Sequence, residues 1–379
     1  MQTPAPASPP RDSVTLIHDY LLVMRGAERT FAAIAELYPQ APILTLLYDE
    51  QATQQRFRGR VTASALQRLG VGQRTFRRLL PLYPLAVGRL QLPPSEIVLS
   101  SSSAFAHGVR VPAGAVHVCY CHAPFRYAWY EEARALAELP AALRPLLRLE
   151  LRRMRAWDAR AASRVDSYIA NSALTRERIK RYYGRDSVVI HPPVETSRFT
   201  PGSHGDSLLV VSELVNHKRV HVALEAAQRA RAPIDVVGTG PEQESLSAAY
   251  PDARFLGRAN DEELAQLYSR ARAVVVPSIE EFGITAVEAQ AAGRPVIAAR
   301  AGGALETVLE GSTGLFAVPD DAGSFAQAIG AIDELEFDPG EAVANAERFS
   351  VERFKARIAE HVAGALNTRK GVRTARDGR

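Results

Sequence analysis

The feature that most constrains the fold is an alternation of short apolar segments with helical segments, which begins twice along the chain. The first series begins at residues 14–18, and the second begins at residues 208–212, after Pro192-Pro193 and the Pro- and Gly-containing segment 201–205. Strands that alternate with helices form mostly parallel sheets covered by those helices. The 379 residues also exceed what one hydrophobic core usually serves. The sequence therefore predicts an α/β protein with two Rossmann-like domains and a linker between them.

Apolar, β-branched runs locate the expected strands. In the first series they cover residues 43–47, 97–100, 116–121, 168–170 and 188–190, and in the second 234–237, 255–258, 273–277 and 295–299. Helices are expected from Gly26 through Leu37 and over residues 285–292. The resulting domains are residues 12–195 and 205–349, followed by a helix at 350–368. We expect a disordered leader at 1–11 and a disordered tail at 369–379.

Two glutamates, Glu280 and Glu288, flank a turn in the strand-loop-helix-strand unit at residues 273–299. In open parallel sheets, ligands bind at the carboxyl ends of the strands, where Glu280 and the turn are expected. Backbone N–H groups at the helix start, beside Gly283, can bind a phosphate. An alternative stays open, because Thr285 and Glu288 have the spacing of a capping box. Glu280 could likewise be a solvated loop residue.

The whole block resembles a known signature. Residues 278–289 (S-I-E-E-F-G-I-T-A-V-E-A), 292–298 (A-G-R-P-V-I-A), Gly302-Gly303, Glu306 and 311–315 (G-S-T-G-L) resemble the E-x7-E region of the retaining GT-B glycosyltransferases of family 4. The resemblance implies two Rossmann-like domains whose sheets face an interdomain cleft, with the final helix crossing back to the first domain. It also implies that Glu280 contacts hydroxyls of the donor sugar and that Glu288 holds the ribose. The turn residues Phe282, Gly283, Ile284 and Thr285 would bind the donor.

A histidine in the first half is the second catalytic candidate. The predicted strand 116–121 delivers His122 to its carboxyl end, and an aromatic segment that contains Arg126 and Trp129 follows. This stretch resembles the Y-C-H-x-P-x-R-Y-x-W segment of family 4 enzymes from bacterial polysaccharide pathways, whose histidine lies at the reaction centre. Most histidines are structural, but one at a strand end before such a loop is a better candidate for function.

Phosphate binding is expected from basic residues at other strand ends. By resemblance, Lys218 and Arg219 follow the first strand of the second domain as the donor diphosphate site, although Glu213 stands where the family often has arginine. The resemblance also implies that Arg25 and Gly26 lie in a loop near donor phosphate and acceptor, with Arg25 in place of the family's glycine. Gly257 and Arg258 end a strand at a corner that faces the nucleotide base in the family. The Gly238-Thr239-Gly240 segment fails as a dinucleotide fingerprint, because Gln243 stands where the third glycine belongs.

Composition and charge narrow the setting. Cys119 and Cys121 cannot form a disulfide framework, which favours a reducing, cytoplasmic location. No run approaches the roughly 18 to 20 apolar residues of a membrane span. Arginines interleave with leucines at positions 74, 77, 78, 89, 144, 148, 152, 153 and 155. They suit either an anionic membrane face, with the protein peripheral at the inner face of the cell membrane, or a solvated helix face. No nucleic-acid-reading module accompanies them.

These observations predict a retaining hexosyltransferase. It would move mannose from GDP-mannose to a lipid-linked or oligosaccharide acceptor in cell-surface polysaccharide biosynthesis. The nucleotide sugar is a substrate, and no cofactor or metal is expected, because cations and helix-start N–H groups can stabilise the leaving diphosphate and no Asp-x-Asp motif matches. Two rivals stay open. One is another GT-B sugar-nucleotide enzyme, such as a 2-epimerase or a sugar-phosphate synthase, and the other is a non-catalytic nucleotide-sugar-binding partner of an assembly complex.

Overall fold

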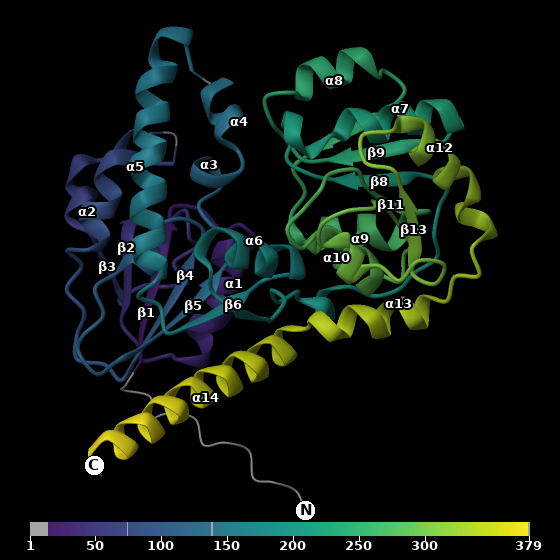
Figure 1. Ribbon diagram of the computed structural model, residues 1–379. Coiled ribbons are helices and arrows are strands. Elements are labelled where there is room, and N and C mark those ends of the chain that lie inside the picture. The colour runs from purple at the N-terminus through teal and green to yellow at the C-terminus, as the bar shows by residue number, and fades with distance from the viewer. Residues whose placement is uncertain (1–13, 74, 138, 378–379) are drawn as a thin grey trace, which may run out of the picture. The chain divides into compact units, whose positions relative to one another are not determined.

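The computed structural model describes residues 14–73, 75–137 and 139–377, with side chains as far as Arg369. The chain divides into two compact units, Met1–His191 with Phe354–Arg379, and Pro192–Arg353. Each unit contains a parallel sheet between helices, so the prediction of two Rossmann-like domains is confirmed (Figure 1). The expected leader at residues 1–11, and Arg74 of the basic segment, lie outside the described residues.

The first unit is built on a seven-stranded parallel sheet of order β3-β2-β1-β4-β5-β6-β7. Its strands are β1 (Val14–Leu21), β2 (Ile43–Tyr48), β3 (Val61–Ala63), β4 (Ile97–Ser102), β5 (Val116–Cys121), β6 (Ser167–Ala170) and β7 (Ser187–Val189). The helices are α1 (Gly26–Leu37), α2 (Tyr83–Val87), α3 (Arg126–Trp129), α4 (Glu132–Ala137), α5 (Arg144–Ala162), α6 (Ala173–Tyr183) and α14 (Val351–Asp377). Strands β1, β4 and β5 are buried almost throughout, as expected for the centre of a sheet covered on both faces.

The second unit has a six-stranded parallel sheet of order β10-β9-β8-β11-β12-β13. Its strands are β8 (Leu208–Val211), β9 (Ile234–Val237), β10 (Arg254–Gly257), β11 (Val274–Val276), β12 (Val296–Ala299) and β13 (Gly314–Ala317). The helices are α7 (Val220–Ala230), α8 (Gln243–Ala249), α9 (Asp261–Arg270), α10 (Ile284–Ala291), α11 (Ala304–Thr307), α12 (Ala322–Ala331) and α13 (Pro339–Ala346).

Two separate cores cover the two faces of this second sheet. Val275 and Ile297 point to one face, where α7 and α12 supply Leu224 and Phe325. Their neighbours Val274, Val276, Val296 and Ala298 point to the other face, where α10 and α13 supply Val287 and Ala346. Because successive side chains of a strand point to opposite faces, a strand buried on both sides must be apolar at every position. This is why the short runs of valine, isoleucine and alanine identify the strands.

The strand order of each sheet contains a reversal. In the first unit the chain builds outward from β1 to β3 and then returns to place β4 on the other side of β1. The second unit does the same with β8 and β11. In open α/β sheets such a reversal opens a crevice at the carboxyl ends of the two central strands, and ligands bind there. The two switch points, β1/β4 and β8/β11, therefore locate where functional side chains are to be sought.

The structure corrects several sequence expectations. Strands β3 and β13 were not anticipated, because β3 has only three residues and β13 begins at Gly314 in a glycine-rich motif. Helix α14 continues to Asp377, so the segment from Arg369 to that residue is helical and not a disordered tail. Residues from Phe354 onward group with the first unit. Among the described residues, no helix has the length and apolar character needed to cross a bilayer.

Candidate functional site

The switch point of the second unit carries a cluster of three polar side chains. Lys218 ends the short 3-10 helix Asn216–Lys218 after β8, and Glu280 lies in the loop after β11. The ammonium of Lys218 donates to both carboxylate oxygens of Glu280, at 2.7 and 2.9 Å. The Ser278 hydroxyl donates to Glu280 Oε1 at 2.5 Å. Two residues that the sequence predicted for a donor site therefore meet across 62 positions of chain.

The environment of Glu280 keeps it ionised. Burial alone would raise the pKa of its carboxyl, but the charge of Lys218 and hydrogen bonds from Lys218 and Ser278 outweigh burial. The net result is a pKa below the ordinary value of 4.5. A fixed carboxylate and a fixed ammonium at a sheet switch point can bind a ligand that has both hydroxyl groups and negative charge.

The helix after Glu280 does not have the capping box that the spacing allowed. Helix α10 begins at Ile284, its N-cap is Gly283 with φ of +86°, and no side chain caps it. The carboxylate of Glu288, one turn further along, instead accepts a hydrogen bond of 2.8 Å from the Tyr268 hydroxyl. Tyr268 is buried, and burial together with the charge of Glu288 raises its pKa well above 10. The capping interpretation of Glu288 is therefore wrong.

Of the other predicted turn residues, Phe282 is buried, whereas Ile284 and Thr285 are half-buried in the first turn of α10. The ring of Phe282 packs against Phe349 with centroids 5.3 Å apart. Phe282 therefore anchors the turn, while the residues around it keep accessible surface.

Two glycines brace the loop that carries Glu280. The N–H of Gly303 donates to the carbonyl of Glu280 at 2.9 Å. A Cβ on Gly302 would lie 2.3 Å from the Glu280 carbonyl oxygen, and a Cβ on Gly303 would lie 2.2 Å from Phe282 Cα. Only glycine permits this approach, and Gly302 also has a left-handed φ of +62°. Sequence inspection found the glycine pair by resemblance but not its contact with Glu280.

The other residues of the second unit that the sequence predicted near the donor are not in contact with Lys218 in any hydrogen bond or ion pair described here. Arg219 has a left-handed φ of +53°, and its Nε lies 2.8 Å from Asp320 Oδ1 beyond β13. Glu213 is exposed. Gly257 has φ of +71°, and a Cβ added there would meet nothing within 4 Å; Arg258 beside it is exposed. The structure therefore joins Lys218 to Glu280 and pairs Arg219 elsewhere.

The switch point of the first unit carries His122. Its Nε2 lies 2.8 Å from the Ser101 hydroxyl of β4, which lies 3.0 Å from Nδ1 of His18 in β1. Burial lowers the pKa of His122 to about 3, and the nearby charge of Arg126 acts in the same direction. His122 is therefore a neutral imidazole, able to donate and accept hydrogen bonds. His18 and Ser101 were missed, although both precede strand ends in the sequence.

A buried aspartate beside His18 was also missed. The Asp19 carboxylate accepts from the backbone N–H groups of four successive residues, Ser103 to Ala106, at 2.5 to 3.0 Å. This fills a backbone concavity of the kind that binds anions and fixes the loop after β4.

The predicted phosphate and acceptor loop lies at the start of α1, where the N–H of Arg25 donates to Glu28 at 3.1 Å. Gly26 begins α1, and burial raises the pKa of Glu28 to about 7.

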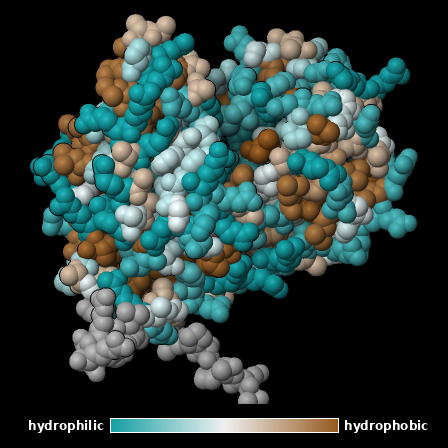
Figure 2. Space-filling view, in the orientation of Figure 1, coloured by the Kyte–Doolittle hydropathy of each residue, from teal (hydrophilic) through white to brown (hydrophobic). Residues whose placement is uncertain are grey.

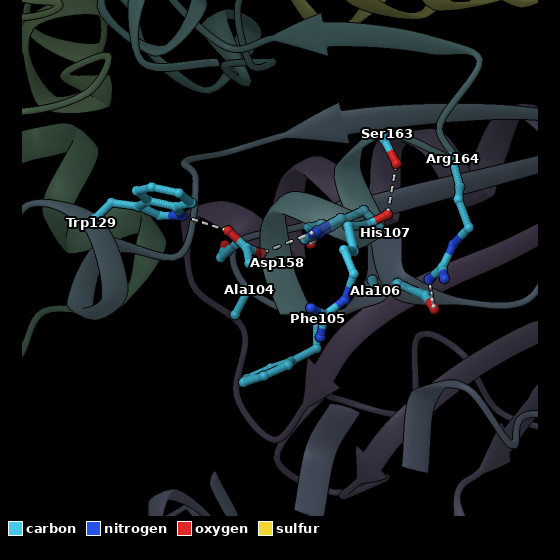
Figure 3. A network of polar contacts seen from close by, with 12 residues as sticks. Ala104, Phe105, Ala106, His107, Trp129, Asp158, Ser163 and Arg164 are labelled. Atoms are coloured by element: carbon cyan, nitrogen blue, oxygen red, sulfur yellow. Dashed lines mark hydrogen bonds and ion pairs between the residues drawn. The ribbon is translucent and has the colours of Figure 1, made fainter. Parts of the chain in front are cut away.

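The aromatic segment after His122 is held to α5. Trp129 Nε1 donates to Asp158 Oδ2 at 2.6 Å, and Asp158 Oδ1 lies 3.1 Å from His107 Nε2 (Figure 3). His107 Nδ1 in turn lies 3.1 Å from the Ser102 hydroxyl. These contacts hold the segment that follows His122 in one position against α5. Within the described part of the chain, no three His, Cys, Asp or Glu residues are grouped to hold a metal ion.

Comparison with known proteins identifies related domains in both halves of the chain. A family model described as Glycosyltransferase Family 4 matches residues 24–198, and one described as Glycosyl transferases group 1 matches residues 205–333. The chain is 34% identical over 211 residues to D-inositol 3-phosphate glycosyltransferase of Geodermatophilus obscurus, covering 46% of this chain and 47% of that protein. It thus spans about half the length of the curated relatives that it matches.

Two solved structures share the fold over nearly the whole chain. Sucrose-phosphate synthase from Thermosynechococcus elongatus superimposes with a TM-score of 0.72 at 19% identity, over 94% of this chain and all of that one. HepE of Anabaena, in complex with UDP-glucose, superimposes with a TM-score of 0.68 at 20% identity, over 93% and 99%. The fold is therefore GT-B. The first unit matches the Glycosyltransferase Family 4 model and the second matches the Glycosyl transferases group 1 model, in agreement with the sequence resemblance.

Proposed function

We propose that the chain is a retaining glycosyltransferase that moves a hexose from a nucleotide sugar to a hydroxyl of a lipid-linked or oligosaccharide acceptor. GDP-mannose is the expected donor and mannose is the sugar that it transfers. The observation that carries the proposal is the cluster of Lys218, Glu280 and Ser278 at the switch point of a group 1 glycosyl transferase domain. We expect no cofactor, because Lys218 and the N–H groups at the start of α10 can stabilise the leaving diphosphate.

The cluster suits the charge changes of glycosyl transfer. When the bond between the anomeric carbon and the diphosphate breaks, negative charge grows on the leaving diphosphate and positive charge grows on the sugar. The Lys218 ammonium and the N–H groups at the start of α10 stabilise the diphosphate. The Glu280 carboxylate accepts hydrogen bonds from sugar hydroxyls, and Glu288, oriented by Tyr268, holds the ribose. His122 contributes a neutral imidazole to the reacting sugar.

A panel of nucleotide sugars tests this proposal and its rivals. The protein is incubated with GDP-mannose, UDP-glucose or other sugar nucleotides, with and without glycan, polyprenyl-linked and sugar-phosphate acceptors. The products are separated by chromatography and their configuration is determined by nuclear magnetic resonance. Release of nucleoside diphosphate that depends on a glycan acceptor, with a product of retained configuration, is the expected result. An epimerised sugar would favour the 2-epimerase, transfer to a sugar phosphate would favour the synthase, and binding without turnover would favour the non-catalytic partner.

For the acceptor, we propose a polyprenyl-linked glycan at an anionic membrane surface, so that the protein acts as a peripheral enzyme at the cytoplasmic face. Large apolar side chains at the start of α5 are exposed, namely Leu143, Leu146 and Leu149 at 49%, 67% and 57%. Arg144 and Arg148 lie between them in the sequence. In Figure 2 hydrophobic and hydrophilic surface lie side by side around the upper end of α5. Exposed leucines beside cations suit the headgroup region of an anionic bilayer. Each cation near such a surface contributes about 1 kcal/mol.

Vesicle co-sedimentation tests the membrane proposal. Vesicles of phosphatidylglycerol and phosphatidylcholine should bind the protein more than phosphatidylcholine alone, and added salt should weaken binding. Replacing Leu146 and Leu149 by serine should reduce binding. The matched control is Leu305→Ser, which removes an equally exposed leucine, at 54%, from the second unit. Equal sedimentation with both vesicle types, or none, would favour a soluble oligosaccharide acceptor.

A further inference from the structure

One serine hydroxyl connects two buried histidines at the switch point of the first unit. Ser101 Oγ lies 3.0 Å from His18 Nδ1 and 2.8 Å from His122 Nε2. His18 and Ser101 are directly paired in the register of β1 and β4, and His122 follows the last residue of β5. All three are buried, at 3%, 1% and 9% exposure. The three groups therefore form one hydrogen-bonded chain across three adjacent strands.

A hydroxyl has one proton, so Ser101 can donate to only one of the two rings and must accept from the other. Burial lowers the pKa of both histidines to about 3, so each ring carries a single proton. Only two arrangements satisfy both contacts. If Ser101 donates to His122 Nε2, the proton of His122 is on Nδ1. If His122 donates to Ser101 from Nε2, its Nδ1 is a bare acceptor and the hydroxyl donates to His18.

The choice between these two arrangements decides whether His122 Nδ1, the ring nitrogen that does not contact Ser101, is protonated. The described residues provide no hydrogen-bond partner for His122 Nδ1, and this atom is not among the fully buried unpaired ones, whereas Nδ1 of His117 is. We propose that Ser101 and His18 are positioning residues that hold His122 in a single tautomer. They thereby fix whether Nδ1 offers a proton or a lone pair to a sugar hydroxyl. The contact with a sugar hydroxyl rests on the proposed function. The presence of a single tautomer is independent of that function.

The same strand supplies a matched control. Ser100 of β4 bonds His117 Nε2 at 2.8 Å, and both residues are buried. Successive side chains of a strand point to opposite faces, so Ser100 faces away from His122. Ser100→Ala therefore removes one buried serine–histidine hydrogen bond, whereas Ser101→Ala, at the neighbouring position, removes two. Only Ser101→Ala removes a bond to His122.

The test is nuclear magnetic resonance of the full chain labelled with ¹⁵N in its histidine rings. Long-range ¹H–¹⁵N correlations separate protonated from bare ring nitrogens, and His122→Gln assigns the His122 signals. We expect one tautomer of His122 in the unmodified protein and in Ser100→Ala, and a change to the other tautomer or to a mixture in Ser101→Ala. Should Ser101→Ala not fold, His18→Phe tests the same link, because phenylalanine can retain the stacking of His18 on Phe31. It should also produce a mixture.

Two results would overturn the proposal. One is a mixture of His122 tautomers in the unmodified protein, and the other is an unchanged single tautomer when Ser101 or His18 is replaced. With an active donor and acceptor pair, kcat of Ser101→Ala should fall roughly ten- to a hundredfold with KM little changed, the size found for outer partners that orient ligating histidines. If no donor and acceptor pair supports transfer, the proposed function is rejected. The tautomer measurement still tests whether Ser101 and His18 control the tautomer of His122.

Discussion

Replacing Gly302 by alanine should disable catalysis through the backbone of Glu280. A Cβ on Gly302 would lie 2.3 Å from the Glu280 carbonyl oxygen, whereas ordinary contact begins at 3.4 Å. The loop must therefore move by about 1 Å, a displacement that can lower a rate roughly 100-fold. Gly302 also has φ of +62°, where a side chain costs roughly 1–2 kcal/mol. We expect both a loss of stability and a large fall in kcat.

Two other glycines separate the two effects. Gly311 has φ of +79° with nothing within 4 Å of an added Cβ, so Gly311→Ala carries the conformational cost without the clash. Gly303 has φ of −67°, and its added Cβ would lie 2.2 Å from Phe282 Cα, so Gly303→Ala carries the clash without the conformational cost.

Urea denaturation measures the stability of each variant, and initial transfer rates measure its activity. Gly311→Ala should lose roughly 1–2 kcal/mol and keep its activity, whereas Gly303→Ala should lose activity. Turnover of Gly302→Ala equal to that of the unmodified protein, under conditions where it is folded, would refute the reasoning.

The remaining predictions concern the charged groups and His122. Lys218→Ala should weaken binding of nucleoside diphosphate as well as of the full donor, measured by calorimetry; unchanged diphosphate affinity would remove Lys218 from the phosphate site. Glu280→Gln should lower kcat more than donor affinity. Because the folded pKa of Glu280 is depressed, its stabilisation is present above the ordinary value of 4.5 and is lost as pH falls through the lower folded value, so the stability gap to Glu280→Gln should shrink in acid. Tyr268→Phe should cost about 1 kcal/mol and weaken donor binding through Glu288, whereas an effect on stability alone would make the contact structural. Finally, because the pKa of His122 is about 3, its ring does not titrate near neutral pH. The pH profile of kcat should therefore show no inflection near pH 7 that belongs to His122; an inflection that is present in the unmodified protein and lost in His122→Ala would contradict this.

Much of the fold could be predicted because strands buried on both faces have a strong local signal. The strands 116–121 and 234–237 and the helix from Gly26 to Leu37 have the predicted bounds. Strand β3, with three residues, and β13, which begins at a glycine, lack that signal. The disordered tail was mispredicted because the polar composition of the tail does not exclude helix.

Candidate residues could be located by motif, but their partners could not. The spacing of Thr285 and Glu288 allowed a capping box, and only the position of Gly283 as N-cap and the bond from Tyr268 to Glu288 excluded it. The ligand site at Glu280 and Glu288 stays a prediction. Arg219 and Lys218 are neighbours in sequence, yet the left-handed backbone at Arg219 accompanies its pairing with Asp320 while Lys218 pairs with Glu280.

The amino-acid sequence by itself determined two α/β domains, the strand that delivers His122 and the strand-loop-helix unit that carries Glu280. These depend on local periodicity and on turn residues, which are written in consecutive positions. Only the tertiary structure decided that Lys218 meets Glu280 and that Ser101 links His18 to His122. Both contacts join segments that become neighbours because the strand order reverses at β8/β11 and at β1/β4. Strand order is set by the packing of the whole sheet and not by any one segment of chain.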